Sequence, residues 1–530
     1  MIRKFTPLSR KKKVWKNMCN YSIIITTVSI CIITQERSVL IMKKKHIVVL
    51  VAMMICLLSL AGSGIFVANV LNAKKEADAE KEANKISYDT FAAWTDVETF
   101  QDVPVMTGKK LSIGKVVDYG KKDYILHVDN TSVEEYKAYL DVLADAGFTK
   151  HSDNGEDAME GYAYTAAFTK DKITVVVSHL IREGKTYISA TKRALSDRMI
   201  YKEEYVQGID PNAKNSLHLV ELGNNGASLV VKLKNGHFVI HDGGNGFDAP
   251  YLLDYLESLT PGDEKPIVEG WFISHPHGDH YGALQAIGQN IGYANRIIVD
   301  GVYFHYPQEQ MIKSETNIYS TLCDMLGVSV KGQDGQVAKN YRPQLGQRYY
   351  FCDITVDVSL TMEQVAVETY QSSDVNDTSS WFKMHIDGQT VLLGGDSSLI
   401  GTRTMMSLYE PSYYAVDIFA VLHHGMNVYQ YFVDSMEVKT LLYPCFRAGS
   451  LYSNKYPNFA REDENESMRT KAEEFYSHGE GTVVMTFPYK VGTAKIMEPC
   501  KWQYSGGMPP ERTTTEWGWE WDGLRYYYNP

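Results

Sequence analysis

The sequence predicts an α/β protein whose main domain is a four-layer αβ/βα sandwich, in which helices cover the outer faces of two sheets. Two observations lead to this prediction. From about residue 215 onward, strand-like and helix-like stretches alternate in two consecutive sets. Carboxylate and imidazole side chains also gather where several apolar strands end, which is where α/β sheets place their sites. A hydrophobic N-terminal span and a small α+β domain precede this main domain.

The composition is that of folded domains. A chain of 530 residues with 44% hydrophobic residues has room for two or three domains, and wholesale disorder is excluded. The net charge is −11, although residues 1–46 hold 11 Lys and Arg and a single Glu. The rest of the chain is therefore strongly acidic, which disfavours nucleic acid as a partner while leaving it open. The seven Cys form no CxxC pair, so a disulfide-dense scaffold and a zinc ribbon are excluded.

The N-terminus predicts a membrane anchor. Residues 47–71 carry no charge, and a helix of that length spans the hydrocarbon core of a bilayer. Lys43, Lys44 and Lys45 precede it, so the positive-inside rule leaves the basic segment 1–46 in the cytoplasm and the body outside. A cleaved signal peptide is the alternative. Met42 with its lysines resembles the start of an exported bacterial protein, which predicts translation from Met42.

A stalk and a small domain follow the span. Residues 72–85 are rich in Ala and charge, as in a helical or flexible stalk. Residues 86–200, here called the accessory domain, predict an α+β fold with strands at 124–128 and 173–179 and a helix over 132–146. No catalytic set of residues stands out in this domain, so we interpret it as a packing or recognition module.

The main domain, residues 215–500, is expected to alternate strands and helices, with turns at Gly223-Asn-Asn-Gly and Lys234-Asn-Gly. The predicted strands are 216–222, 227–233, 237–241, 267–273, 296–300, 381–386, 390–394, 417–422, 440–443 and 482–487. The predicted helices are 251–259, 281–289, 308–326, one after Ser398, 429–436 and 461–475.

The strongest chemical signal is Ser274-His-Pro-His-Gly-Asp-His280, between a predicted strand and a predicted helix. His275 and His277, two residues apart at a strand end, can direct both rings at one ion. Asp279 and His280, at the start of the helix, can reach a second ion. Imidazole with carboxylate suits Zn²⁺ and related divalent ions. A solvated cluster of histidines is the alternative, and the apolar flanks and the spacing disfavour it.

Three other strand ends carry matching residues. The turn Asp242-Gly-Gly follows an apolar strand, and Asp242 is expected to hold the metal-ligating side chains in place through hydrogen bonds. An ordinary hairpin turn is the alternative. Gly394-Gly-Asp396 places a carboxylate after another buried strand, where it needs a partner. His423-His424-Gly425 ends a third strand with two imidazoles.

These motifs together resemble the metallo-β-lactamase-fold hydrolase superfamily, over roughly residues 216–500. The stretch from Asn376 to Asp396 and the His-His-Gly motif resemble the hydrolase domain of DNA-uptake channels, and the His-His pair also resembles that of cell-surface choline-phosphate esterases. The His-x-His-x-Asp-His element is specific for the superfamily and uninformative about substrate. Both relatives look like phosphoesterases.

The resemblance implies two divalent metal ions, zinc in the first place and manganese as the alternative. His275 and His277 would hold one ion, Asp279 and His280 the other, and Asp396 would bridge them. His424 is favoured as the last ligand and His423 as a donor to a substrate phosphoryl oxygen, although the two could be exchanged. The resemblance implies a metal-bound hydroxide as nucleophile, with Asp279 and His423 as catalytic residues.

One departure from the family pattern is visible. The family often supplies a further His shortly before the strand that leads to the bridging Asp. Here His305 comes too early and His385 falls within a strand, and Asn376-Asp377 occupies the expected place. The first ion would then have an oxygen or water ligand, bind more weakly, or be Mn²⁺.

The sequence as a whole predicts a membrane-anchored, extracytoplasmic metal-dependent phosphoesterase that acts on a small-molecule or cell-envelope substrate. The second hypothesis is a hydrolase of a lactam, lactone or thioester, and the third is a non-catalytic binding module. The intact ligand set disfavours the third.

The aromatic tail, residues 501–530, contains Trp517-x-Trp519-x-Trp521 and Tyr526-Tyr-Tyr, which predict packing on the main domain or, alternatively, binding to sugars or choline-like cations. Substrate and oligomeric state are left open.

Overall fold

The computed structural model describes most of the chain from residue 98 onward. The described residues are 98–106, 111–115, 124–155, 158–222, 226–305, 330–369, 375–445, 462–478, 481–497, 513–514, 519–521 and 526–528. The chain divides into two units, Met1–Lys85 and Ile86–Pro530. The predicted span, the stalk and the predicted helix 308–326 lie outside the described residues. Within the described part, no helix combines the length and the apolar character needed to cross a bilayer.

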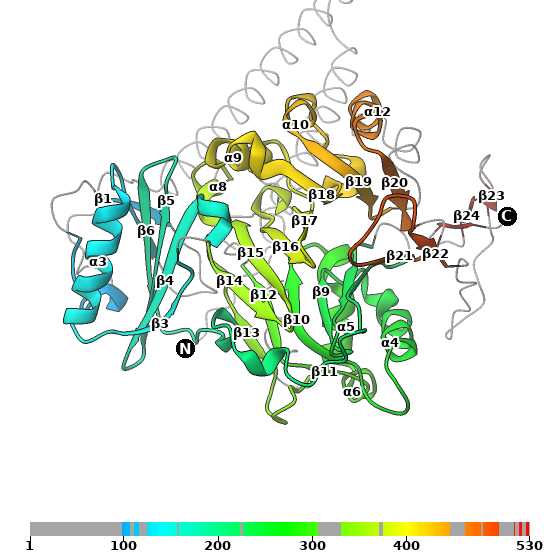
Figure 1. Cartoon of the computed structure of the whole chain (residues 1–530), viewed down its shortest axis with the longest axis horizontal. Coiled ribbons are helices and arrows are strands. Elements are labelled where there is room, and N and C mark those ends of the chain that lie inside the picture. Colours follow the sequence, from blue (N-terminus) through cyan, green and yellow to red (C-terminus); the bar gives the residue numbers. More distant parts are fainter. Residues whose placement is uncertain are drawn as a thin grey trace, which may run out of the picture. The chain divides into compact units, whose positions relative to one another are not determined.

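The accessory domain is an antiparallel sheet with one helix on its face (Figure 1). The strand order is β1-β2-β6-β5-β4-β3. Helix α3 (Val133–Asp145) begins after Ser132, which exchanges hydrogen bonds with Glu135 in a capping box. Tyr136 and Leu143 of α3 pack against the sheet in one apolar core. The strands are β1 (Leu111–Lys115), β2 (Tyr124–Val128), β3 (Thr149–Asp153), β4 (Ala163–Lys170), β5 (Ile173–Leu180) and β6 (Lys185–Thr191).

The main domain contains two mixed sheets. The first has the order β13-β12-β10-β9-β8-β7-β21-β22, with β11 beside β10, and its strands β9, β10, β12 and β13 run parallel. These strands are β7 (Ser216–Leu219), β8 (Leu229–Lys232), β9 (Phe238–His241), β10 (Ile267–Ile273), β11 (Ile298–Val299), β12 (Gly301–Phe304), β13 (Lys339–Tyr341), β21 (Val483–Thr486) and β22 (Lys495–Ile496).

The second sheet has the order β14-β15-β16-β17-β18-β19-β20, and its last four strands run parallel. Its strands are β14 (Arg348–Phe351), β15 (Ile354–Leu360), β16 (Trp381–Ile386), β17 (Gln389–Leu393), β18 (Ala415–Ala420), β19 (Glu437–Tyr443) and β20 (Glu474–Ser477).

Most α-helices of the main domain follow its parallel strands, whereas α8 follows the antiparallel β15, and short 3-10 helices occur in both domains. The α-helices are α4 (Ala249–Ser258), α5 (Gly278–Gln289), α6 (Ile291–Ala294), α8 (Met362–Thr369), α9 (Leu399–Leu408), α10 (Gln430–Ser435) and α12 (Glu462–Lys471). Short 3-10 helices are η2 (Glu98–Phe100), η3 (Ala158–Gly161), η4 (Asp197–Met199), η5 (Glu203–Tyr205), η6 (Gly246–Asp248), η7 (Val375–Thr378), η8 (Pro411–Tyr414) and η9 (Leu422–Gly425).

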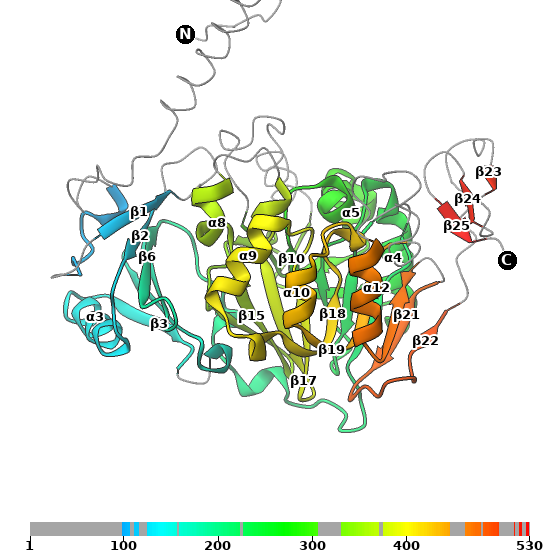
Figure 2. The same ribbon diagram turned by 90° about the horizontal axis from the view of Figure 1, so that it is seen from above.

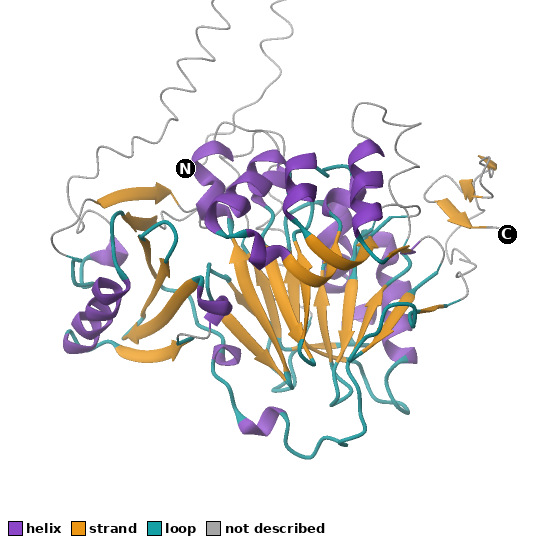
Figure 3. Ribbon diagram, turned by 45° about the horizontal axis from the view of Figure 1, so that its top comes forward, coloured by secondary structure: helices purple, strands orange, loops and turns teal. Residues whose placement is uncertain are grey.

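The main domain consists of two sheets between two sets of helices (Figure 3). Three apolar cores separate these four layers. The first lies between α4 and α5 and the first sheet, the second between the two sheets, and the third between the second sheet and α9 and α10. Because successive residues of a strand face opposite sides, Trp271 of β10 lies in the first core and Phe272 in the second. Figure 2 shows α9, α10 and α12 side by side across the second sheet. The predicted α/β layer arrangement of the main domain is confirmed.

The accessory domain packs directly on the second sheet and its helices. Tyr162 lies edge-on to Tyr409 and Tyr413, with ring centroids 5.7 and 5.2 Å away. The buried Lys383 of β16 donates to Glu160 Oε1 at 2.7 Å and lies 4.3 Å from the centre of the Tyr413 ring. An ion pair and an aromatic cluster thus join the two domains.

The C-terminal tail contains a three-stranded antiparallel sheet. Its strands are β23 (Thr513–Thr514), β24 (Trp519–Trp521) and β25 (Tyr526–Tyr528). The register pairs Trp519 with Tyr528 and Trp521 with Tyr526. Packing and sugar binding by this tail both stay predictions.

Candidate metal centre

The candidate residues lie where strands of both sheets end at one edge of the sandwich. In the first sheet, β9 and β10 run parallel and end at His241 and Ile273. In the second, β17 and β18 run parallel and end at Leu393 and Ala420. The candidate residues follow these strand ends, so the centre is built from side chains of both sheets.

The segment from His275 to His280 turns from β10 into α5. His277 keeps an extended backbone immediately before the helix, so Asp279 and His280 fall in its first turn. His275 and His280 are buried, whereas His277 and Asp279 are partly exposed. Nε2 of His275 lies 3.0 Å from Nδ1 of His277. The short loop thus delivers two pairs of donors, one before the helix and one inside it.

Asp396 reaches the same point from the second sheet because the turn before it is made of glycine. Gly395 has a φ of +53°, and a Cβ there would lie 2.6 Å from the Cβ and Oγ of Ser274. Only glycine therefore lets this turn approach the end of β10 so closely. The Asp396 carboxylate then lies 3.0 Å from Nε2 of His280 and 3.8 Å from Nε2 of His275.

His423 and His424 occupy η9, after β18, with φ values of +49° and +56°. Left-handed backbone costs a non-glycine residue of order 1–3 kcal/mol, and such strain clusters at functional sites. His424 is buried and its Nδ1 donates to the carbonyl of Pro444 at 2.7 Å. Its Nε2 lies 3.3 Å from Asp279 and 3.5 Å from Asp396. The side chain of His423 is 19% exposed, with Nε2 3.5 Å from Asp396.

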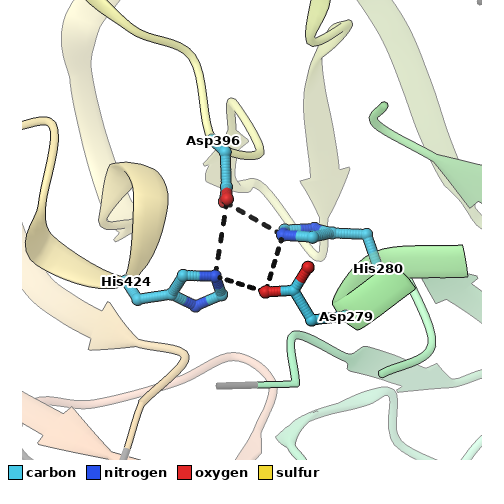
Figure 4. A group of neighbouring side chains, drawn as sticks. All are labelled: Asp279, His280, Asp396 and His424. Atoms are coloured by element: carbon cyan, nitrogen blue, oxygen red, sulfur yellow. Dashed lines mark ion pairs between the residues drawn. The ribbon is translucent and has the colours of Figure 1, made fainter. Parts of the chain in front are cut away.

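The structure brings these donors into two adjoining clusters. One consists of Asp279, His280, Asp396 and His424, here called the four-donor cluster (Figure 4). The other consists of His275, His277 and Asp396, here called the three-donor cluster. Within each cluster the ligand atoms all lie within 4.8 Å of one another. Asp396 belongs to both clusters, whereas His423 belongs to neither. The ligand roles themselves stay predictions.

Asp242 lies behind the centre and fixes its imidazoles. The residue adopts a φ of +57° after β9 and is buried. Its carboxylate accepts hydrogen bonds from the backbone N and Oγ of Ser274, at 2.8 and 2.9 Å, and from Nδ1 of His280 at 2.8 Å. Because Ser274 Oγ gives its proton to Asp242, it accepts from Nδ1 of His275 at 3.0 Å. Both rings thereby present Nε2 to the centre.

Burial alone would raise the pKa of Asp242, but His241 and His280 outweigh it and lower that pKa to about 2. Burial would also raise the pKa values of Asp279 and Asp396, yet the neighbouring imidazoles hold both below the usual range. Conversely, burial would lower the pKa of His424, and the carboxylates, Asp396 foremost, raise it to about 10. The centre therefore stabilises positive charge.

The residues fit divalent metal ions. Nε2 of His280 and Nε2 of His424 are buried and form no well-aligned hydrogen bond, although carboxylate oxygens lie 3.0–3.5 Å from them. Both atoms belong to the four-donor cluster, where they lie beside carboxylate oxygens. A cation bound there would satisfy both nitrogens and offset the burial of two carboxylates.

Among the described residues, no further histidine completes the three-donor cluster. His305, after β12, lies 3.0 Å from Glu363 and 2.9 Å from the Pro343 carbonyl. His385 lies 3.2 Å from Asp357. Asp377 accepts from Ser398 Oγ and the backbone N of Ile400 and Gly401 (3.2 Å each) at the start of α9. These residues serve the fold, which explains why the stretch expected to replace the family's histidine lies outside both clusters.

Sequence reasoning missed two supporting residues. Ser274 connects Asp242 to His275, and a hydroxyl residue directly before a His-x-His motif was the available signal. Asn427 donates through Nδ2 to the Asp396 carbonyl at 3.0 Å. No pattern in the sequence distinguishes this Asn, because only the fold of the loop after η9 brings it to the turn after β17.

No family model and no curated protein matches the chain. Solved structures similar to it are metallo-β-lactamase-fold proteins. YhfI from Bacillus subtilis is 12% identical, with a TM-score of 0.31, over 52% of this chain and 99% of YhfI. Zn²⁺-bound PqqB from Methylobacterium extorquens is 9% identical, with a TM-score of 0.30, over 50% of this chain and 98% of PqqB.

A third similar structure is Tm1679, described as a metal-dependent hydrolase of the β-lactamase superfamily. It is 11% identical to this chain, with a TM-score of 0.29, and the match covers 50% of this chain and 95% of Tm1679.

Proposed function

We propose that the chain is a metal-dependent hydrolase that cleaves phosphoester bonds, with phosphodiesters as the first substrates to test. The observation that carries the proposal is the pair of adjoining clusters that share Asp396. Two donor sets joined by one carboxylate suit a binuclear centre. Such a centre, when loaded, supplies Lewis acidity toward a phosphoryl oxygen and lowers the pKa of water.

The residues around the centre would then divide the remaining work. The neighbouring imidazoles hold the pKa of Asp279 low although burial opposes this, so its carboxylate stays ionised and can accept a hydrogen bond from the attacking water. Burial lowers the pKa of His423, so this imidazole is neutral at pH 7. A neutral ring can still donate from Nε2 to a phosphoryl or leaving-group oxygen, and the side chain is 19% exposed.

The preference for phosphoesters rests on the sequence. The stretch from Asn376 to Asp396 and the His-His-Gly motif resemble phosphoesterases. Nε2 of His423 lies 3.5 Å from the Asp396 carboxylate that both clusters share. An imidazole donor at this position could stabilise the negative charge of a phosphoryl group bound at the centre. The same centre would also serve a lactam, lactone or thioester, since only the walls of the substrate site would differ.

The test is hydrolysis of bis-p-nitrophenyl phosphate by the full-length protein in detergent, loaded with Zn²⁺ or Mn²⁺ or treated with a chelator. We expect metal-dependent turnover that His277→Ala lowers at least about 100-fold. His151→Ala, at a partly exposed histidine of β3 in the accessory domain, is the matched control. A chromogenic cephalosporin runs in parallel, and its cleavage alone would move the assignment to amide hydrolysis. Absence of turnover of both probes by the fully loaded protein would contradict the proposal.

The location of the enzyme is a separate part of the proposal. The uncharged stretch 47–71, preceded by three lysines, supports a single-pass anchor with the main domain outside the cytoplasm. Protease added to intact cells should then digest the main domain. Full protection of the main domain in intact cells, with digestion only after lysis, would contradict an outside location.

A further inference from the structure

We infer that the two ion sites are unequal: the four-donor cluster fills first and holds its ion through purification, whereas the three-donor cluster exchanges its ion with the surroundings. The inference rests on the proposed metal-dependent hydrolase and adds a form of control to it. The retained ion would stabilise the fold, and the exchangeable ion would set the activity.

Donor number and charge give the first argument. The four-donor cluster offers two imidazoles and two carboxylates, which is enough to close a tetrahedral site. The three-donor cluster offers two imidazoles and only the shared carboxylate of Asp396. An ion in the first cluster already neutralises part of that carboxylate and repels a second ion nearby. The second binding step is therefore weaker for electrostatic reasons alone.

Preorganisation gives the second argument. In the four-donor cluster, His280 is held by the ionised carboxylate of Asp242 at 2.8 Å, and His424 by the Pro444 carbonyl at 2.7 Å. Both rings are buried and already present Nε2 to the centre. A fixed ring loses little freedom when it binds an ion.

The three-donor cluster is less ready for an ion. His275 is held through the hydroxyl of Ser274 rather than by a carboxylate. Its Nε2 lies 3.0 Å from Nδ1 of His277, so one of these two nitrogens donates a hydrogen bond to the other. An ion that enters must displace that proton before both nitrogens can bind it. His277 is also partly exposed, which leaves this side of the centre open to water and substrate.

The position of the clusters gives the third argument. Asp279 and His280 come from α5, behind the first sheet, whereas Asp396 and His424 follow strands of the second sheet. An ion in the four-donor cluster thus connects the two halves of the sandwich. His275 and His277 both come from the loop after β10, so the three-donor cluster reaches the second sheet through Asp396 alone. Loss of its ion should leave the fold nearly unchanged.

The test is metal titration of the chelator-treated full-length protein, followed by native mass spectrometry, calorimetry and thermal unfolding. We expect two binding steps whose dissociation constants differ at least about 10-fold, with nearly all of the rise in Tm on the first step. His277→Ala should keep the tight step and its Tm rise and lose the weak step. Asp279→Asn, at a partly exposed carboxylate, should weaken the tight step, and His424→Ala should abolish it.

The outcomes separate this inference from the proposed function. Two steps of equal affinity, or a tight step lost in His277→Ala and kept in His424→Ala, would overturn the inference while leaving the hydrolase proposal intact. No bound ion in the wild-type protein would overturn both. If His424→Ala does not fold, Asp279→Asn carries the test, because unchanged tight binding in that variant contradicts the inference.

Discussion

The Oδ1 atom of Asp396 lies 3.0 Å from Nε2 of His280, so a carboxylate from the second sheet meets an imidazole carried by the helix behind the first sheet. The two groups form an ion pair without a well-aligned hydrogen bond. Buried polar groups of both sheets therefore meet at this edge with hydrogen-bonding capacity that a bound ion could use. A divalent ion is the partner that the donor set fits.

Removal of the Asp242 carboxylate should weaken both sites at once. In Asp242→Asn, an amide replaces a carboxylate that accepts hydrogen bonds from both Ser274 and His280. In one orientation the amide directs its N–H at Nδ1 of His280. In the other orientation its oxygen faces His280 and no longer accepts from Ser274. We expect metal affinity to fall about 10- to 100-fold, measured by competition with a chromogenic chelator. Asp417→Asn, at a carboxylate of β18 paired with Lys439, is the matched control. An unchanged affinity in Asp242→Asn would show that the centre does not depend on this support.

The two neighbouring histidines should behave differently. His424 lies in the four-donor cluster and His423 does not. His423→Ala should therefore keep the wild-type number of bound ions and lose turnover, by about 10²- to 10⁴-fold for a lost proton donor. Metal content by mass spectrometry and kcat on the same preparation provide the measurement. Loss of an ion in His423→Ala, with full retention in His424→Ala, would exchange the two roles.

Stability of the metal-free protein should fall in mild acid, partly through His218. This buried ring of β7 bonds Ser216 and Tyr255, and burial lowers its pKa from 6.5 to about 4. Between those values the unfolded chain takes up a proton that the folded chain refuses. The free energy of unfolding is therefore kept above pH 6.5 and declines as the pH falls, by up to about 1.4 kcal/mol per pH unit from this residue.

His218→Gln should make that decline shallower. Urea unfolding in the presence of a chelator, from pH 7 to pH 4.5, measures both proteins without interference from metal loss. Parallel stability curves for wild type and variant would refute the role given to His218.

Loss of the Glu160–Lys383 ion pair should lower the free energy of unfolding, and a second substitution that removes the lysine charge should restore part of that loss. Glu160→Gln leaves the buried ammonium without its carboxylate, and we expect a loss of about 1–3 kcal/mol in the free energy of unfolding. Lys383→Met in that background removes the charge and should restore part of the loss. Additive losses in the double variant, measured by urea unfolding, would mean that the pair does not join the domains as described.

The sequence predicted the elements that have clear hydrophobic periodicity and turn or capping residues at their ends. Strand 267–273 coincides with β10, and strand 381–386 with β16. The predicted strand 296–300 contains only the two residues of β11, because β12 begins again at Gly301 as a separate strand. The hairpin of β14 and β15 was missed because its turn contains no glycine: Cys352 takes the left-handed conformation instead.

The site was easier to predict than its support. The spacing of His275, His277, Asp279 and His280 is visible in one loop, so their convergence could be expected. Asn427 could not be found, because its contact with the Asp396 carbonyl exists only after two loops fold together. The ion pair between His305, which follows β12, and Glu363 of α8 likewise depends on contacts that form only in the folded protein.

X-ray diffraction from zinc-loaded crystals of the full-length protein, with anomalous data above and below the zinc edge, would locate the bound ions. We expect two anomalous peaks about 3.5–4 Å apart, on either side of Asp396, the stronger one among Asp279, His280 and His424. A lone peak at the four-donor cluster would be expected at low zinc concentration. Absence of any peak at this edge of the sandwich, or a peak bound by other residues, would mean that these clusters are not the metal centre.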